Sequence, residues 1–216
     1  MDETLLAEKS MAAFWQHWLA SYPSRVAANT HRLQTEAAPI PCREVLNRQY
    51  YRRYAGVPLN ILEAAGRHWY DSYRRGGTAF VTPTLDAVAA HRAQGNEIVL
   101  VSGSMRPLLV PLAQELGATV RCTELVVGAD GVLTGEVHRP MIGQAKADAA
   151  IRVMREHGAD PKGCSAYGDH ESDLALLRAV GHPVVVGDSV RLNEEAQRLG
   201  GAVATAPPGP LRKKRG

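Results

Sequence analysis

The feature that most constrains the fold is a regular alternation of short apolar runs and helical segments in the part of the chain after Gly77. The apolar runs predict short strands, and the segments between them have the spacing of helices. We expect strands at 97–101, 164–167, 183–186 and 202–204, and helices at 83–92, 105–116, 146–157, 172–179 and 190–199. Strands that alternate with helices form a parallel sheet covered on both faces, so the sequence predicts an α/β protein.

One pair of predicted strands departs from this alternation. Apolar segments at 119–127 and 132–138 flank the turn sequence Gly-Ala-Asp-Gly at 128–131. A short turn of this composition between two such segments is a strong signal for a β-hairpin. We therefore predict a hairpin inserted between two strand–helix units.

The first third of the chain shows a different pattern, without strands. Apolar and aromatic residues at helical spacing predict helices at 5–19, 41–54 and 58–75. The first of these ends at Pro23, and prolines at 41 and 58 are suited to open the other two. Residues 8–75 are therefore predicted to be all-helical. The Pro- and Gly-rich, basic segment 206–216 is predicted to be a disordered tail.

Composition and charge argue against several classes of protein. The formal charge of +3 comes from basic residues at 212–215, so the rest of the chain is nearly neutral. It lacks the excess of positive charge that is typical of nucleic-acid-binding proteins. No apolar run is long enough to span a membrane, and the N-terminus lacks a signal-peptide pattern. Cys42, Cys122 and Cys164 are widely spaced, which indicates reduced thiols, as expected for a cytoplasmic protein.

The clearest chemical signal is a pair of aspartates, Asp169 and Asp173. They lie four residues apart where the predicted strand 164–167 turns into a helix. Residues four apart share one face of a helix, and at the carboxyl edge of a parallel sheet that face borders the crevice where ligands bind. Two carboxylates there suit a hard cation such as Mg²⁺. The alternative is that Asp169 caps the helix and Asp173 is a solvated acid in its first turn.

Two further positions have the character of an anion site. Ser102 and Gly103 directly follow the strand 97–101, and a hydroxyl with free backbone N–H groups at a helix start binds anions. A plain helix cap is the alternative. Lys146 opens the helix 146–157, where a cation opposes the helix dipole, so an anionic partner would account for it. A solvated surface lysine is the alternative.

Taken in chain order, these features follow Asp2-Glu3-Thr4 at the N-terminus. Their order, spacing and strand–helix setting resemble the four motifs of the haloacid dehalogenase superfamily, most closely its phosphoserine-phosphatase-like branch. The resemblance covers residues 1 to about 204. It implies a Rossmann-like three-layer α/β core with a parallel sheet, and an inserted all-helical cap. The core would comprise 1–7 and 76–205, and the cap 8–75.

The resemblance also assigns roles to the motif residues. Asp2 matches the second aspartate of the motif Asp-x-Asp-x-Thr, which is the general acid/base and binds Mg²⁺ through its backbone carbonyl. Asp169 matches the direct Mg²⁺ ligand, and Asp173 matches the residue that supports it. Lys146 is implied to neutralise the nucleophile and the phosphate. The phosphoryl group is implied to be bound by Thr4, Ser102, Gly103 and Lys146.

The implied activity is that of a phosphoric monoester hydrolase. It is the Mg²⁺-dependent hydrolysis of a small-molecule phosphate ester through an aspartyl-phosphate, with no nucleic-acid or membrane partner. The nucleophilic aspartate belongs two positions before Asp2, ahead of Met1, together with the central strand that carries it. We therefore expect that the natural chain starts upstream and that the printed chain is a poor catalyst. Two alternatives are an inactive binding protein that keeps the cleft and a phosphotransferase with an acceptor other than water.

The substrate is not predicted by these motifs. In phosphoserine phosphatases a cap glutamate binds the substrate amine, and Lys9 takes that position here, which argues against phosphoserine. One or two basic or aromatic residues of the helical part are expected to face the cleft, and the others to be solvated or packed. The candidates are Arg43, Arg48, Arg52, Arg53, Tyr50, Tyr51 and Tyr54.

Overall fold

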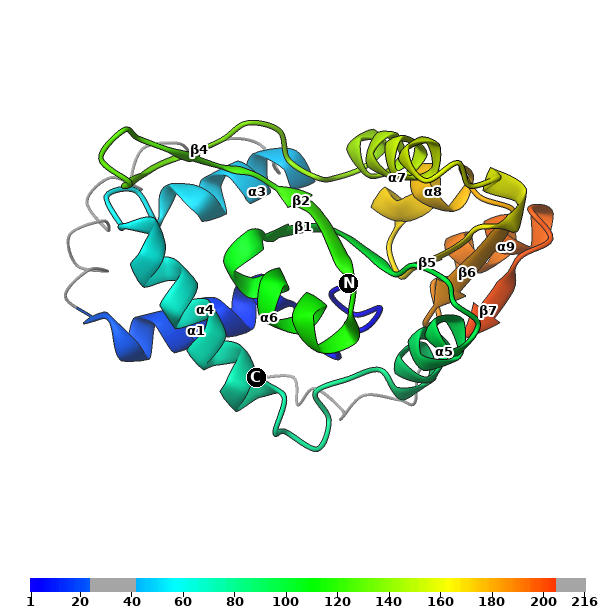
Figure 1. Cartoon of the computed structure of the whole chain (residues 1–216), viewed down its shortest axis with the longest axis horizontal. Coiled ribbons are helices and arrows are strands. Elements are labelled where there is room, and N and C mark those ends of the chain that lie inside the picture. Colours follow the sequence, from blue (N-terminus) through cyan, green and yellow to red (C-terminus); the bar gives the residue numbers. More distant parts are fainter. Residues whose placement is uncertain (24–41, 205–216) are drawn as a thin grey trace.

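The computed structural model describes residues 1–23 and 42–204, and its elements follow the predicted alternation (Figure 1). The helices are α1 (Ser10–Ser21), α3 (Arg43–Arg52), α4 (Leu59–Tyr73), α5 (Thr82–Ala93), α6 (Arg106–Leu116), α7 (Gln144–Glu156), α8 (Leu174–Leu177) and α9 (Val190–Arg198). The strands are β1 (Val99–Met105), β2 (Thr119–Thr123), β3 (Leu125–Val127), β4 (Leu133–Val137), β5 (Ser165–Gly168), β6 (His182–Val186) and β7 (Ala202–Ala204). The predicted helix start at Pro41 and the predicted tail 206–216 lie outside the described residues.

The strands of the α/β part form two parallel sheets. β1 pairs with β2, while β5 pairs with β6 and β6 with β7, all in parallel. Helix α5 lies on one side of these strands, and α7 and α8 lie on the other (Figure 1). The predicted α/β class is therefore confirmed. In the ranges that the structure describes, no helix is long and apolar enough to cross a membrane.

Two predicted strands have different bounds in the structure. The strand expected at 97–101 extends to Met105, so Ser102 lies inside β1 and not at a helix start, and the register with β2 shifts between these two residues. The segment expected at 119–127 is not one hairpin strand. Its first part is β2, beside β1, and only β3 pairs with β4 in the hairpin. Apolar alternation marks a strand but does not reveal its partner, which explains both differences.

The helical segment shares one large core with β1 and α6. The buried side chains of this core include Phe14, Trp18, Tyr51, Tyr54, Leu62, Trp69, Met105, Leu108 and Leu112. Helices α4 and α6 approach so closely that a Cβ added at Gly66 would lie 2.3 Å from the carbonyl oxygen of Pro107. The bounds of the helical segment as a separate cap, and its action as a lid, stay predictions.

A smaller aliphatic core holds the other parallel sheet. It is formed by Ala166, Leu176, Leu177, Val185, Leu192 and Ala196. These residues come from β5 and β6 and from α8 and α9, which pack on them. The described residues therefore form two cores that share no buried residue, one aromatic-rich and one aliphatic.

Candidate active site

The first residues of the chain bring Thr4 to the end of β5. The backbone N–H groups of Thr4, Leu5 and Leu6 all donate to the Met1 carbonyl oxygen, so the chain turns sharply after Met1. The buried Thr4 donates its hydroxyl hydrogen to Asp169 Oδ1. This contact joins the N-terminal motif to the motif that follows β5.

A buried ion pair links two further predicted site residues. Lys146 Nζ lies 2.5 Å from Asp173 Oδ1, and the two side chains are only 11% and 5% exposed. Burial opposes ionisation of Asp173, but the Lys146 ammonium group and the other donors outweigh it, and the pKa of Asp173 lies below its ordinary value. The backbone N–H of His170 also donates to Asp173 Oδ2, at 3.3 Å. The carboxylate of Asp173 is therefore ionised and held in one place.

The two aspartates do not lie on one helix face, so that prediction is wrong. Asp169 follows β5 directly, and Asp173 ends the 3₁₀ turn Glu171–Asp173, which precedes α8. Gly168 permits this arrangement, because a Cβ there would lie 2.7 Å from the Cβ of Asp173. Both carboxylates still lie beyond the carboxyl end of β5, where a parallel sheet presents its ligand-binding residues.

Met1 and Asp2 lie within the same charged cluster. Burial lowers the pKa of the Met1 α-amino group, and Lys146 lowers it further, while Asp2, Asp173 and Asp169 oppose the shift. Burial raises the pKa of the Asp2 carboxyl group, and nearby donors and positive charges offset only part of that shift. In the described part of the chain, Asp2 Oδ1 is buried without a hydrogen-bond partner. A buried carboxyl group of this kind is suited to hold a proton and to give it up to a ligand.

Ser102 lies within β1 and is tied into a chain of hydroxyl contacts. Its hydroxyl oxygen accepts a hydrogen bond from the Ser104 N–H at 3.1 Å, and the Ser104 and Ser10 hydroxyl oxygens lie 3.0 Å apart. Across residues 1–23 and 42–204, Ser102 makes no hydrogen bond with Lys146. The predicted convergence of Ser102 and Lys146 on one phosphate therefore stays a prediction.

A set of contacts at Gly103 escaped the sequence analysis. Its carbonyl oxygen accepts hydrogen bonds from Asn47 Nδ2 at 2.8 Å, the Tyr51 hydroxyl at 2.8 Å and the Thr123 hydroxyl at 3.0 Å. Asn47 and Tyr51 are four apart on α3, and both are buried. These hydrogen bonds attach α3 directly to β1 near its carboxyl end, where its pairing with β2 is irregular. The one sequence signal for this was an amide side chain at helical spacing from the buried tyrosines.

Most of the basic and aromatic candidates of the helical part are engaged away from the cluster. Arg48 donates to the Val137 carbonyl oxygen at 2.8 Å, Arg52 pairs with Glu136 at 3.4 Å, and Arg53 lies 4.9 Å from the centre of the Trp15 ring. The aromatic candidates Tyr50, Tyr51 and Tyr54 belong to the large core. The expectation that most of these side chains are packed or solvated is consistent with these contacts.

Arg43 and His170 lie at the border of the charged cluster. Burial lowers the pKa of His170, and the positive charge of Arg43 lowers it further, against the effect of Asp173, Asp169 and Glu171. Arg43 is exposed at the first turn of α3, and its positive charge acts on His170, which lies just after β5. Helix α3 and the turn that follows β5 thus both present a side chain at this border.

The oxygen donors of the cluster fit Mg²⁺ better than a transition metal. Asp169, Asp173 and Thr4 offer hard oxygen ligands, and Mg²⁺ is often bound by one or two carboxylates that are supplemented by water and phosphate oxygens. Among the described residues, no three His, Cys, Asp or Glu side chains gather into a complete metal site. A bound Mg²⁺ would therefore depend on water and on the phosphate for the rest of its shell.

The geometry agrees with a comparison against known families. A model of the haloacid dehalogenase-like hydrolase family matches residues 1–178. The chain therefore belongs to the haloacid dehalogenase-like hydrolases, and the family predicted from the order of its motifs is confirmed.

Individual relatives extend this comparison. The chain is 37% identical over 125 residues to a probable phosphatase of Mycobacterium tuberculosis, a match that covers 56% of this chain and 44% of that protein. It therefore spans less than half the length of that relative. It is 29% identical over 178 residues to a histidinol-phosphatase of Neisseria meningitidis, which covers 73% of this chain and 80% of that protein.

The fold has a counterpart among solved structures. The crystal structure of a phosphoserine phosphatase in its apo form aligns with a TM-score of 0.64 at 18% identity, over 94% of this chain and 89% of that one. At this level of identity the similarity establishes the shared fold alone.

Proposed function

We propose that the protein is a phosphatase that hydrolyses small-molecule phosphate monoesters with the help of Mg²⁺, through an aspartyl-phosphate intermediate. The main support is the buried cluster in which Lys146 pairs with Asp173 next to the contact between Thr4 and Asp169. Phosphoryl transfer depends mostly on positioning and on neutralisation of charge, and a buried cluster of fixed charges supplies both.

In this proposal the phosphoryl group is bound at the carboxyl ends of β1 and β5. Lys146 offsets its negative charge, while Ser102 and Gly103 provide hydrogen-bond donors for its oxygens. The Thr4 hydroxyl would join them by turning its hydrogen from Asp169 to a phosphoryl oxygen. The ion pair with Asp173 holds the Lys146 ammonium group in place before a substrate arrives.

Asp169 and the backbone carbonyl of Asp2 are the proposed direct ligands of Mg²⁺, and Asp173 supports the metal site from beside them. When bound, Mg²⁺ supplies positive charge next to the phosphoryl oxygens. The short distance between Asp173 and Lys146 means that the lysine and the metal would share one negative neighbour.

Asp2 is the proposed general acid/base. The raised pKa of the Asp2 carboxyl group favours its protonated form, and the proton is proposed to pass to the leaving alkoxide. The resulting carboxylate then takes a proton from the attacking water. The nucleophile is an aspartate two positions before Asp2, supplied by polypeptide ahead of Met1. Its carboxylate oxygen bonds to phosphorus as the alkoxide departs, and water then breaks that bond to release phosphate.

The substrate site is proposed to lie between the cluster and a helical cap of residues 8–75, which opens over a core of 1–7 and 76–205. Arg43 and His170 border this space and suit a small substrate with an anionic or ring-bearing group. The relative named a histidinol-phosphatase places histidinol phosphate, with phosphoserine, among the first compounds to test. We propose that the protein acts in the cytoplasm.

The test compares the 216-residue chain with a form that carries an apolar segment and Asp-x directly ahead of Asp2. We expect Mg²⁺-dependent hydrolysis of an aryl phosphate only in the extended form, and its loss when the metal is removed by a chelator. Asp169→Asn should lower that activity at least about a hundredfold. The outcome against the proposal is that the 216-residue chain is fully active and that Asp169→Asn abolishes this activity. Another residue would then be the nucleophile. A panel of phosphate esters then identifies the substrate.

A further inference from the structure

β1 contains a bulge directly after Ser102. Between the paired residues Ser102 and Met105, β1 has two residues more than β2, namely Gly103 and Ser104. These two residues have no opposite residue on β2, so their backbone groups are not used by the pairing of the two strands. A bulge of this kind frees backbone groups for other contacts and redirects neighbouring side chains, and bulges are frequent next to active sites.

The carbonyl group of the bulge is held from two sides. Asn47 and Tyr51 of α3 each donate to the Gly103 carbonyl oxygen at 2.8 Å, and Thr123 of β2 donates to it at 3.0 Å. A carbonyl oxygen has two lone pairs, so three donors saturate it. The direction of this carbonyl group is therefore fixed by α3 and β2 together.

The same peptide unit also holds the hydroxyl group of Ser102. The Ser104 N–H belongs to the planar unit of the Gly103 carbonyl group and points the opposite way. It donates to Ser102 Oγ at 3.1 Å. A serine hydroxyl has one hydrogen to donate and two lone pairs that accept, so this bond directs the hydrogen away from the bulge. Within residues 1–23 and 42–204, no acceptor binds that hydrogen.

This group of contacts is buried although it is polar. Within the ranges that the structure describes, eight polar or charged residues are buried, and five of them belong to this group or touch it. The five are Ser10, Asn47, Ser102, Ser104 and Thr123. Burial of a polar group costs free energy unless the group is hydrogen-bonded, and apolar side chains could fill the same space. The hydrogen bonds therefore provide a fixed orientation, which apolar packing alone does not.

Thr123 connects the bulge with the segment that leads to Lys146. The fully buried Thr123 hydroxyl oxygen accepts a hydrogen bond from the Met141 N–H at 3.0 Å. Met141 precedes α7, and Lys146 lies in the first turn of that helix. A Cβ added at Gly103 would lie 3.3 Å from Cγ1 of Ile142, so this segment packs directly on the bulge. The two elements of the proposed phosphate site are thus joined through Thr123.

We propose that Asn47 and Tyr51 are positioning residues for the hydroxyl group of Ser102. They fix the carbonyl group of the bulge, the N–H of the same peptide unit holds the Ser102 oxygen, and the hydroxyl hydrogen stays free to donate to a phosphoryl oxygen. Helix α3 thereby contributes to the phosphate site without touching the phosphate. This inference rests on the proposed phosphatase function for the identity of the ligand.

Amide hydrogen exchange of the 216-residue chain, measured residue by residue by NMR, tests the structural step. The double variant Asn47→Leu, Tyr51→Phe removes both donors of α3. We expect exchange at Ser104 to become at least about tenfold faster, while exchange at 99–101, where β1 pairs regularly with β2, changes by less than about twofold. Unchanged exchange at Ser104, or an equal increase along the whole of β1, would overturn the proposal.

Tyr50→Phe is the matched control on the same helix. The Tyr50 hydroxyl is also buried, but it lies 2.8 Å from the Tyr54 hydroxyl and makes no contact with the bulge in the described part of the chain. It should leave exchange at Ser104 unchanged, and an increase as large as that of the double variant would overturn the proposal. If the double variant does not fold, Asn47→Leu alone should change exchange in the same direction by a smaller factor.

Binding of inorganic phosphate in the presence of Mg²⁺ tests the link to the ligand. A misplaced Ser102 hydroxyl loses one hydrogen bond to an anion, so affinity should fall about tenfold in the double variant and not in Tyr50→Phe. Unchanged affinity together with faster exchange at Ser104 would overturn the proposal. If the unaltered chain binds no phosphate, the phosphatase function is contradicted, and exchange at Ser104 still decides whether Asn47 and Tyr51 hold this peptide unit.

Discussion

The two sides of β1 differ in how completely their groups are packed and paired. On the side of β2 and the helical segment, β1 belongs to the large core, and three side chains donate to the Gly103 carbonyl oxygen near its carboxyl end. On the side of β5, the same strand borders a cavity, and the small core beyond contains six buried residues without an aromatic side chain.

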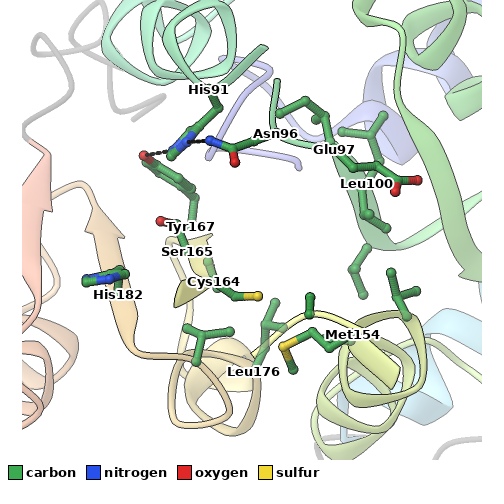
Figure 2. Close-up of a pocket in the computed structure, with 18 of the residues that line it drawn as sticks. His91, Asn96, Glu97, Leu100, Met154, Cys164, Ser165, Tyr167, Leu176 and His182 are labelled. Atoms are coloured by element: carbon green, nitrogen blue, oxygen red, sulfur yellow. Dashed lines mark hydrogen bonds between the residues drawn. The ribbon is translucent and has the colours of Figure 1, made fainter. Parts of the chain in front are cut away.

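This difference shows what holds the candidate site together. The half that carries β5 meets the rest of the molecule through packing of α7 on β1 and through polar contacts at both ends of the strands, including the Thr4–Asp169 hydrogen bond and the contact of His91 with Tyr167 (Figure 2). The half with the helical segment is held by apolar packing. We therefore expect the half that carries β5 to open locally before the rest of the molecule unfolds, and this opening to separate the residues of the candidate site.

The largest effect is expected from Lys146→Met, which removes the partner of a buried carboxylate. Asp173 would remain charged or be forced to take up a proton in a buried place, so the free energy of unfolding should fall by about 3–5 kcal/mol. Urea denaturation measures this loss. The double variant with Asp173→Leu should recover most of the loss, and Lys162→Met, at an exposed position of the same half, is the control. A loss as small as that of the control would contradict a buried pair.

A pair of leucines compares the two cores directly. Leu112 on α6 and Leu192 on α9 are both fully buried, and truncation of each to alanine should cost about 2–5 kcal/mol. We expect the upper part of that range for Leu112→Ala, because the surrounding aromatic core cannot close around the gap. Leu192→Ala should speed hydrogen exchange in β6 and β7 while β2 and α6 stay protected. Uniform loss of protection in both variants would show that the halves unfold as one unit.

Gly168→Ala tests how closely the end of β5 approaches Asp173. The new Cβ would lie 2.7 Å from the Cβ of Asp173, so the turn must shift at a cost of about 1–3 kcal/mol. Thermal unfolding should show a lower Tm. Gly163→Ala is the matched control in the same half, since a Cβ there meets nothing within 4 Å. Equal melting temperatures for the two variants would argue against the close approach.

The smallest effect is expected from Tyr51→Phe on the well-packed side. It removes one of three donors to the Gly103 carbonyl oxygen, and Asn47 and Thr123 still satisfy that oxygen, so the loss should be about 1 kcal/mol. Chemical denaturation measures it. The control is Ser72→Ala, which removes an exposed hydroxyl that donates to the His68 carbonyl oxygen and should have no measurable effect. A loss of several kcal/mol would mean that Tyr51 alone holds α3 on β1.

Much of the fold and part of the site follow from local features of the sequence. Apolar runs and the residues that start and stop helices are properties of neighbouring positions, so the succession of elements from α5 to β7 could be predicted. The approach of Thr4 to Asp169 and of Lys146 to Asp173 agrees with the predicted grouping of motifs. The prediction that Asp169 and Asp173 share one face of a helix was wrong, because the turn between them depends on how tightly Asp173 packs on Gly168.

The sequence by itself determined the class of the protein: an α/β chain whose motifs occur in the order of the haloacid dehalogenase-like hydrolases. Only the tertiary structure decided that Ser102 lies within β1, that Asn47, Tyr51 and Thr123 meet at the Gly103 carbonyl oxygen, and that a cavity separates β1 from β5. The physical reason is that strand pairing and side-chain contacts of this kind join distant segments. The spacing of apolar residues within a segment predicts whether that segment is a helix or a strand. It does not predict which other segment packs against it.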